Sequence, residues 1–221
     1  MPDGRRTAEL AAFLKSEFGR RLHGRERLKV LLRPYTCPFD ELLTYIEPGS
    51  TIFDIGCGPG TFLALALEFS RPRKAVGIDI RPAAVETASA MLESFIARGI
   101  AQVGRYDGST LPVSLSEADT VFLIDVFHYL PVASRALFVS EIYGKMKPGA
   151  RLVFKDIDAA DRLLLYLNKL HNALVSGALV HEVSSKDAYE LLRKTGFEVD
   201  ARPKRRMFWY SHFTLVGRKP I

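Results

Sequence analysis

The chain has 221 residues, which suits one globular domain with small appendages and is long enough to bury a sizeable core. It is 48% hydrophobic and 25% charged, with 16 glycines and 12 prolines, and this excludes a collagen-like or a disordered chain. Part of the net charge of +6 lies in residues 1–33, which hold nine basic and four acidic residues, and in a second basic cluster over residues 202–206.

The first segment is predicted to be helical over residues 7–32, because apolar side chains recur there at intervals of three and four. Pro34 is expected to break this segment. A second short helix is predicted over residues 39–46, so that residues 1–49 form an N-terminal helical extension or lid. The apolar side chains at helical spacing are Leu10, Phe13, Leu14, Phe18 and Leu22.

From residue 50 onward, short apolar strands alternate with helices. This alternation predicts an α/β fold, a doubly wound and mostly parallel sheet with helices on both faces. The expected strands are 51–55, 74–80, 100–106, 120–124 and 151–155, and the expected helices are 61–69, 82–98 and 132–146. The predicted domain, 50–221, continues with a helical insertion at about 156–186, a helix at 186–194, and two paired strands, 197–202 and 212–217.

The cellular location expected from the sequence depends on three features: membrane helices, a signal peptide and cysteine content. No apolar run reaches the roughly 18 residues of a membrane helix, and the first ten residues lack the apolar core of a signal peptide. Cys37 and Cys57 are too few for a disulfide scaffold and are expected to be free thiols. We therefore expect a soluble cytoplasmic protein.

The most informative segment is IFDIGCGPG at residues 52–60, where an apolar strand runs into a glycine-rich turn and then a helix. Glycine permits a tight turn and lets a ligand approach the backbone, and the helix that follows offers unpaired N–H groups. The spacing is G-x-G-x-G, which differs from the G-x-G-x-x-G of dinucleotide-binding enzymes. A nicotinamide-dependent dehydrogenase is therefore disfavoured.

Three aspartates follow or close successive predicted strands. Asp54 would repel a pyrophosphate but suits an ammonium group, Asp79 is placed to bind both hydroxyls of a ribose, and Asp107 can accept from the exocyclic amine of adenine. Each has a plainer alternative, since Asp54 could cap a turn and Asp107 could form an Asx-turn. Together, an amine, a ribose diol and an adenine amine without a phosphate describe S-adenosylmethionine.

Residues 50–217 resemble a class I, seven-stranded S-adenosylmethionine-dependent methyltransferase. The resemblance lies in IFDIGCGPGTFL, AVGIDIRPAAVETA, GRYDGSTLP, ADTVFLIDVFHYLP, MKPGARLVFKDID, LLRKTGFEV and HFTLVGRKP, in the expected order. It implies the strand order 3-2-1-4-5-7-6 with strand 7 antiparallel, and S-adenosylhomocysteine as the product. It also implies cofactor contacts by Asp54, Gly56, Cys57, Gly58, Gly60, Asp79, Ile80, Asp107, Gly108 and Asp125.

Methyl transfer depends mainly on aligning the acceptor with the sulfur–methyl bond, and a base is needed only when the acceptor must lose a proton. His128 follows the fourth strand and is one candidate base; alternatively it bonds the next helix or lines the cofactor pocket. His171 is a second candidate, on a helical face that alternatively turns to solvent. Asp156, His171 and His181 lack the close spacing of metal ligands, so no metal is predicted. Cys57 is expected to pack beside the cofactor rather than act as a nucleophile.

The sequence thus predicts methyl transfer to an oxygen or nitrogen of a small, lipophilic molecule. The basic N-terminal segment could also touch an acidic membrane, or could simply be a solvated face. An RNA methyltransferase is the alternative, supported by the two basic clusters but lacking the Asn/Asp-Pro-Pro-aromatic motif of enzymes that methylate base amines. A non-catalytic cofactor-binding module is a third interpretation. The sequence does not predict the oligomeric state.

Overall fold

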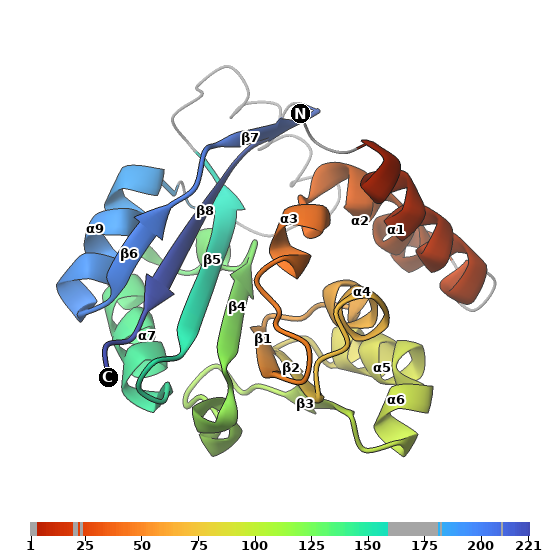
Figure 1. Ribbon diagram of the computed structural model, residues 1–221, viewed down its shortest axis with the longest axis horizontal. Helices are drawn as coiled ribbons and strands as arrows, with labels where there is room; N and C mark the ends of the chain where they lie inside the picture. Colours follow the sequence, from red (N-terminus) through yellow and green to blue (C-terminus); the bar gives the residue numbers. More distant parts are fainter. Residues whose placement is uncertain (1–3, 20–21, 23, 159–180, 182, 209) are drawn as a thin grey trace. The chain divides into compact units, whose positions relative to one another are not determined.

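The computed structural model describes residues 4–19, 22, 24–158, 181, 183–208 and 210–221 (Figure 1). The chain divides into two compact units, Met1–Thr110 and Leu111–Ile221. In each unit parallel strands are joined through helices, which confirms the predicted α/β class. Among the described residues, no helix combines the length and the apolar character needed to cross a membrane.

The first unit contains three parallel strands, with β2 (Lys74–Asp79) between β1 (Thr51–Ile55) and β3 (Ala101–Arg105). This order confirms the predicted 3-2-1 half of the sheet. Every residue of β1 is buried, as expected of a parallel strand covered on both faces. Helix α4 (Thr61–Phe69) contacts β2, and α5 (Pro82–Met91) contacts β2 and β3.

The predicted helix over residues 82–98 is in fact two helices, because the chain leaves the helical conformation at Leu92. Leu92 has φ −101° and ψ 11° and is fully buried. The second piece, α6 (Glu93–Ala97), buries none of its side chains. Packing of Leu92 into the core therefore takes precedence over a continuous helix.

The single helix predicted over residues 7–32 is also wrong, since the structure has α1 (Gly4–Phe18) and α2 (Gly24–Thr36). Gly24 has a φ of 56°, in the left-handed region, which interrupts a right-handed helix. Pro34 lies within the last turn of α2 instead of ending it. The short helix α3 (Phe39–Leu43) follows.

Aromatic contacts fix these N-terminal helices within the first unit. Phe13 of α1 packs edge-on against Phe69 of α4 with ring centroids 5.4 Å apart. Phe39 of α3 stacks on Phe62 of α4 at 5.9 Å. Both partners belong to α4, the helix that follows the glycine-rich turn, so α1 and α3 pack against that helix.

In the second unit, β8 (Tyr210–Arg218) runs antiparallel to β5 (Arg151–Ile157) on one side and β6 (Glu198–Ala201) on the other, and β4 (Thr120–Ile124) pairs in parallel with β5. This confirms the predicted 4-5-7-6 half of the sheet and its antiparallel final strand. The helices are α7 (Val132–Lys145) and α9 (Ser185–Thr195), with single turns η1 (Val113–Glu117) and η2 (Phe127–Tyr129).

Two features of this unit were not predicted. Strand β5 continues two residues beyond Lys155, because Asp156 and Ile157 pair with β8. The stretch between the last two predicted strands contains a further strand, β7 (Arg205–Met207), which pairs with β8 across a turn at Phe208. Phe208 has a φ of 53°, the left-handed conformation that such a reversal needs. Most of the predicted insertion, residues 159–180, lies outside the described part of the chain.

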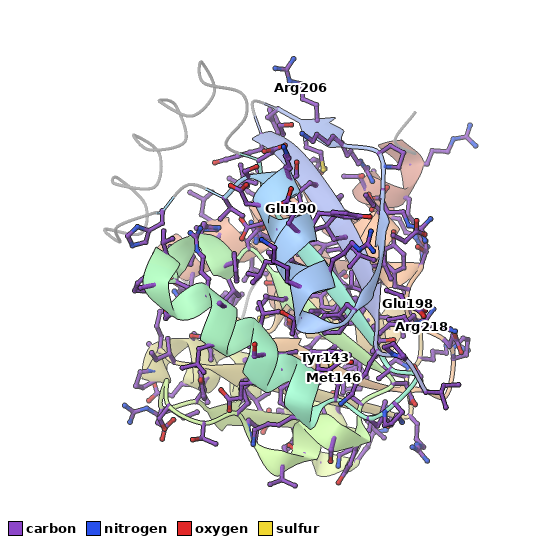
Figure 2. The ribbon with its side chains drawn as sticks, turned by 90° about the vertical axis from the view of Figure 1, so that its left-hand side faces the viewer. Tyr143, Met146, Glu190, Glu198, Arg206 and Arg218 are labelled. Carbon is purple, nitrogen blue, oxygen red and sulfur yellow. The ribbon has the colours of Figure 1, made fainter. Side chains whose placement is uncertain are left out.

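Lys219 is expected to stabilise the second unit by capping α7. Its ammonium donates to the backbone oxygens of Tyr143 (2.7 Å) and Met146 (2.6 Å), at the end of the helix where carbonyls lack partners. Figure 2 labels these two acceptor residues at the end of α7. We expect Lys219→Met to lower the free energy of unfolding by about 1–2 kcal/mol in urea titrations. Lys147→Met, which removes an ion pair at the surface, is the control and is expected to cost less than about 1 kcal/mol. Equal losses in the two variants would contradict the capping role.

Candidate functional site

The glycine-rich turn after β1 is held by backbone hydrogen bonds to β2. The N–H groups of Gly56 and Cys57 both donate to the oxygen of Ile78, at 2.7 and 2.9 Å. The φ angles of Gly56, Gly58 and Gly60 are 77°, 57° and 83°, all in the left-handed region. A Cβ on Gly60 would also lie 3.1 Å from the Cβ of Ala88. The backbone conformation therefore favours glycine at all three positions, and close packing requires it at Gly60 as well.

Asp79, the last residue of β2, ties the turn to the start of α5. Its Oδ2 accepts from the Gly58 N–H at 2.9 Å, and its Oδ1 accepts from the N–H and the Nε of Arg81 at 2.9 and 3.2 Å. The carboxylate is buried. Two carboxylate oxygens offer about four acceptor positions, and three are used here, so Asp79 retains one position, on Oδ2, for a hydroxyl group of a ligand.

Asp54 is buried in β1 beside Asp79. Burial and the negative charge of Asp79 raise the pKa of Asp54 to about 8, against the opposing effect of Arg33 on α2. Within the described part of the chain, the Oδ1 of Asp54 is buried and has no hydrogen-bond partner. Such a group is costly in the folded protein, and a cationic donor would relieve that cost. The predicted ammonium contact supplies that kind of donor.

Ile80, Asp107 and Gly108 form a neighbouring group at the ends of β2 and β3. Ile80 is 58% exposed although it is large and apolar. A Cβ on Gly108 would lie 3.4 Å from its Cδ1, so the two residues are adjacent. The Oδ1 of Asp107 accepts from the Ser109 N–H at 2.8 Å, which is the alternative Asx-turn, and this bond lowers the pKa of Asp107. An apolar surface beside an exposed carboxylate suits a flat heterocycle with an amino group.

Cys57 is a packing residue in this arrangement. Burial raises the pKa of its thiol, and the nearby charges of Asp54 and Asp79 raise it further. A Cβ on Gly77 of β2 would lie 2.9 Å from its Sγ and 2.5 Å from Leu63. The thiol therefore stays protonated, as expected for a group that fills space and not for a nucleophile.

In the second unit, Asp125 is held by Lys155. Its Oδ1 accepts from the Lys155 Nζ at 2.6 Å, and its N–H donates to the Lys155 backbone oxygen at 2.9 Å. Both side chains are buried, and Asp125 has a φ of 53°. Lys155 was not predicted as a site residue; its signal in the sequence was a lysine at the end of an apolar strand, LVFK.

His128, in η2, is paired with Asp156 of β5. Its Nδ1 lies 2.6 Å from the Oδ1 of Asp156, and its backbone N–H donates to Oδ2 at 3.2 Å. Burial lowers the pKa of His128, but the charge and hydrogen bond of Asp156, together with Asp125, outweigh burial and the charge of Lys155, so the net shift is upward. The role of His128 as a base stays a prediction.

Asp125, His128 and Asp156 offer ligand atoms within 4.8 Å of one another and could in principle hold a metal ion. The ammonium of Lys155 already compensates Asp125, and His128 is already bonded to Asp156. A metal ion would have to displace both contacts. The groups present therefore suit an internal network of charges better than a metal centre.

Two further histidines considered in the sequence analysis, His181 and His171, add little to the description of the site. His181 donates its backbone N–H to the oxygen of His128 at 2.8 Å, which places its segment beside η2. His171, the second candidate base, lies outside the described residues.

The sequence matches a family model described as "Methyltransferase domain" over residues 26–202. It is 25% identical over 173 residues to a probable methyltransferase, LtbC, of Aspergillus luteorubrus, covering 72% of this chain and 61% of the relative. It is 26% identical over 181 residues to trans-aconitate 2-methyltransferase of Methylobacterium radiotolerans, covering 75% and 65%. The chain thus spans less than two thirds of the length of these relatives.

Among solved structures, the chain resembles magnesium protoporphyrin IX methyltransferase from Synechocystis, which was solved with bound S-adenosylhomocysteine. The TM-score is 0.68 at 18% identity, and the match covers 94% of this chain and 99% of that one. At this level of identity the likeness shows the fold, an α/β domain with a mostly parallel sheet.

Proposed function

The chain belongs to the methyltransferase-domain family, and on that premise we propose that it transfers a methyl group from S-adenosylmethionine to a small, lipophilic molecule. The assignment of S-adenosylmethionine as the cofactor rests mainly on Asp54. Its buried Oδ1 has no partner in the described part of the chain, and the ammonium of the methionyl group would satisfy it. A pyrophosphate at the same place would meet a carboxylate instead.

The first unit supplies contacts for each part of this cofactor. Asp54 would accept from the ammonium, Asp79 from the ribose hydroxyls and Asp107 from the adenine amine, with Ile80 against the ring. Asp79 is already fixed by Gly58 and Arg81, and the position left on Oδ2 can accept a ribose hydroxyl without rearrangement of the carboxylate. When bound, the cofactor supplies an activated methyl group on a sulfonium. The protein then has to align the acceptor and exclude water.

Two observations support a small, lipophilic acceptor. Helix α2 exposes Leu28, Leu32 and Tyr35, which recur at intervals of four and three and so share one face. One relative acts, by its name, on trans-aconitate, a small molecule.

RNA is the second candidate acceptor, and the basic residues around β7 favour it. Figure 2 shows Arg206 pointing away from the ribbon, and Phe208, next to the strand, is 65% exposed. The support for RNA is reduced because two other basic residues of the 202–206 cluster pair with carboxylates. Lys204 pairs with the buried Asp158, and Arg202 lies 3.2 Å from Asp200.

The two acceptor classes are distinguished by one experiment. Protein and S-adenosylmethionine with a labelled methyl group are incubated with a panel of lipophilic alcohols, phenols, amines and acids, and in parallel with total RNA. We expect label in the organic extract and none in RNA. Label in RNA that falls steeply between about 50 and 200 mM salt would favour the RNA alternative, since phosphate contacts release counterions.

A further inference from the structure

Helix α2 of the first unit has an exposed apolar face opposite its buried one. Leu28, Leu32 and Tyr35 are 61%, 48% and 40% exposed, and their spacing places them along one side of the helix. Val30 lies on the other side, where α2 packs on α1, and is fully buried. Among the described residues, no other helix exposes three large apolar side chains. A patch of this kind on an already packed helix indicates a contact with a partner.

Basic side chains border the apolar face of α2 on both sides. Arg27 and Lys29 precede and follow Leu28, so each lies about 100° away from it around the helix. Arg27 is exposed, and Lys29, which donates to Glu26 at 2.9 Å, keeps 36% of its side chain exposed. The helix as a whole has four basic residues and one acidic residue. Its charge therefore complements an acidic partner.

The types of these side chains favour a lipid surface as the partner. At such a surface, long basic side chains lay their alkyl stems along apolar chains and keep the charge in water, whereas lysine is depleted at the centre of protein interfaces. Tyr35 ends the face, and tyrosine is enriched at the boundary between acyl chains and headgroups. Leu28 and Leu32 offer no ring for a base to stack on, which disfavours RNA.

The shape of the apolar face agrees with a flat partner. Leu28 and Tyr35 are seven residues apart, so the face extends roughly 10 Å along the helix axis. A helix surface is convex, and a flat layer can contact all three side chains at once. The helix is already folded on its buried side, so docking needs little further ordering of the backbone.

We propose that α2 docks this protein onto the surface of a membrane that contains acidic lipids. Leu28, Leu32 and Tyr35 would enter the boundary between headgroups and acyl chains, with Arg27 and Lys29 at the headgroups. This inference goes beyond the proposed function and requires neither the cofactor nor the second unit. Docking would bring the protein to the place where a lipophilic acceptor is dissolved.

Flotation with lipid vesicles tests this contact directly. The full chain is mixed with vesicles of phosphatidylcholine alone, or of phosphatidylcholine with phosphatidylglycerol, at about 50 and 300 mM salt. We expect the protein to float with the mixed vesicles at low salt, less so at high salt, and little with phosphatidylcholine alone. Absence of flotation with the mixed vesicles at low salt would overturn the proposal.

A double variant tests the apolar part of the contact. Leu28→Gln with Leu32→Gln removes two apolar side chains without changing the charge, and glutamine is a good helix former. We expect the lipid concentration for half-maximal binding to rise about tenfold or more. Leu137→Gln is the matched control, because Leu137 lies on α7 and is 76% exposed. Equal affinities of the double variant and the control would contradict the proposal.

Single variants test the charged part. Arg27→Gln is expected to weaken binding to the mixed vesicles about fivefold, since one basic residue near an acidic surface contributes about that much. Lys194→Gln, at an exposed position on α9, is the control and should bind like the unmodified protein. Equal losses in these two variants would show that only the net charge of the chain matters, and would overturn the proposal.

Two other occupants of the apolar face would be recognised in the same experiments. Loss of binding in Arg27→Gln but not in the double leucine variant would indicate a purely electrostatic site, as for RNA. Sedimentation velocity without vesicles detects the other: a dimer that dissociates in the double leucine variant would show that a second copy of the chain covers this face. Either result would overturn the proposal.

Discussion

Replacing Asp79 with alanine is expected to weaken S-adenosylhomocysteine binding at least about a hundredfold. The variant loses the acceptor for the ribose hydroxyls and also the contacts that position Gly58 and Arg81. A hydrogen bond to a charged group contributes about 1.5–3 kcal/mol, and a hundredfold change in affinity corresponds to roughly 2.8 kcal/mol. Calorimetric titration with S-adenosylhomocysteine measures the effect.

The control for this variant is a carboxylate with no role in the turn. Asp119 forms an ion pair with Lys147 at the surface of the second unit, and Asp119→Ala should keep its affinity within about threefold. Thermal unfolding of both variants shows whether the proteins remain folded at the temperature of the titration. A folded Asp79→Ala protein with unchanged affinity would contradict the assigned role.

Replacing Asp54 with asparagine is expected to move stability and cofactor affinity in opposite directions. The folded pKa of about 8 lies above the ordinary value of 3.8, so the folded state retains a proton that the unfolded state has lost. The contribution of Asp54 to stability is therefore most favourable below about pH 4 and declines as the pH rises to about 8, by several kcal/mol at about 1.4 kcal/mol per pKa unit. An asparagine side chain does not titrate, so the advantage of Asp54→Asn is greatest above pH 8.

Urea titrations at pH 5 and pH 9 measure this difference in stability. We expect the free energy of unfolding of Asp54→Asn to exceed that of the unmodified protein at pH 9 by more than at pH 5. Its affinity for S-adenosylhomocysteine should fall by at least about tenfold, because a charge-assisted bond to the ammonium is replaced by a neutral one. A variant with the same pH dependence of stability as the parent would show that Asp54 does not carry the shifted pKa.

Proton release provides an independent check on Asp54. An ammonium ligand favours the ionised carboxylate, so binding near pH 7 should expel the proton that the free protein holds. Calorimetry in two buffers with different ionisation enthalpies counts the protons released. We expect release approaching one proton for the parent and close to none for Asp54→Asn; equal release by the two proteins would argue against an ammonium at Asp54.

The strands and the glycine-rich turn could be predicted because their signals are local, whereas the order of the strands in the sheet came from the resemblance to a family. Each strand is a short apolar run, and the G-x-G-x-G spacing alone indicates a tight turn. The breaks near Gly24 and at Leu92 were missed, since both sit inside a continuous apolar periodicity. Strand β7 was missed because its three residues form a strand only through pairing with β8.

The charged network of the second unit shows a different limit of sequence analysis. His128 and Asp156, like Asp125 and Lys155, are about 30 residues apart in the chain and meet only because β4 and β5 are neighbours. Asp125 was predicted from resemblance alone, as a cofactor contact, and that role stays a prediction. The pairing of Asp125 with Lys155 could not be predicted from the sequence, because it depends on the fold that places β4 beside β5.

The central claim is that the first unit binds S-adenosylmethionine and not a dinucleotide. Its most direct test is calorimetric titration of cofactor-free protein with S-adenosylhomocysteine and, separately, with NADH. We expect micromolar binding of S-adenosylhomocysteine and no binding of NADH, because an ammonium stabilises the ionised form of the buried Asp54, whereas a pyrophosphate supplies no cation there. Binding of NADH without binding of S-adenosylhomocysteine would contradict the assignment of Asp54 and of the glycine-rich turn.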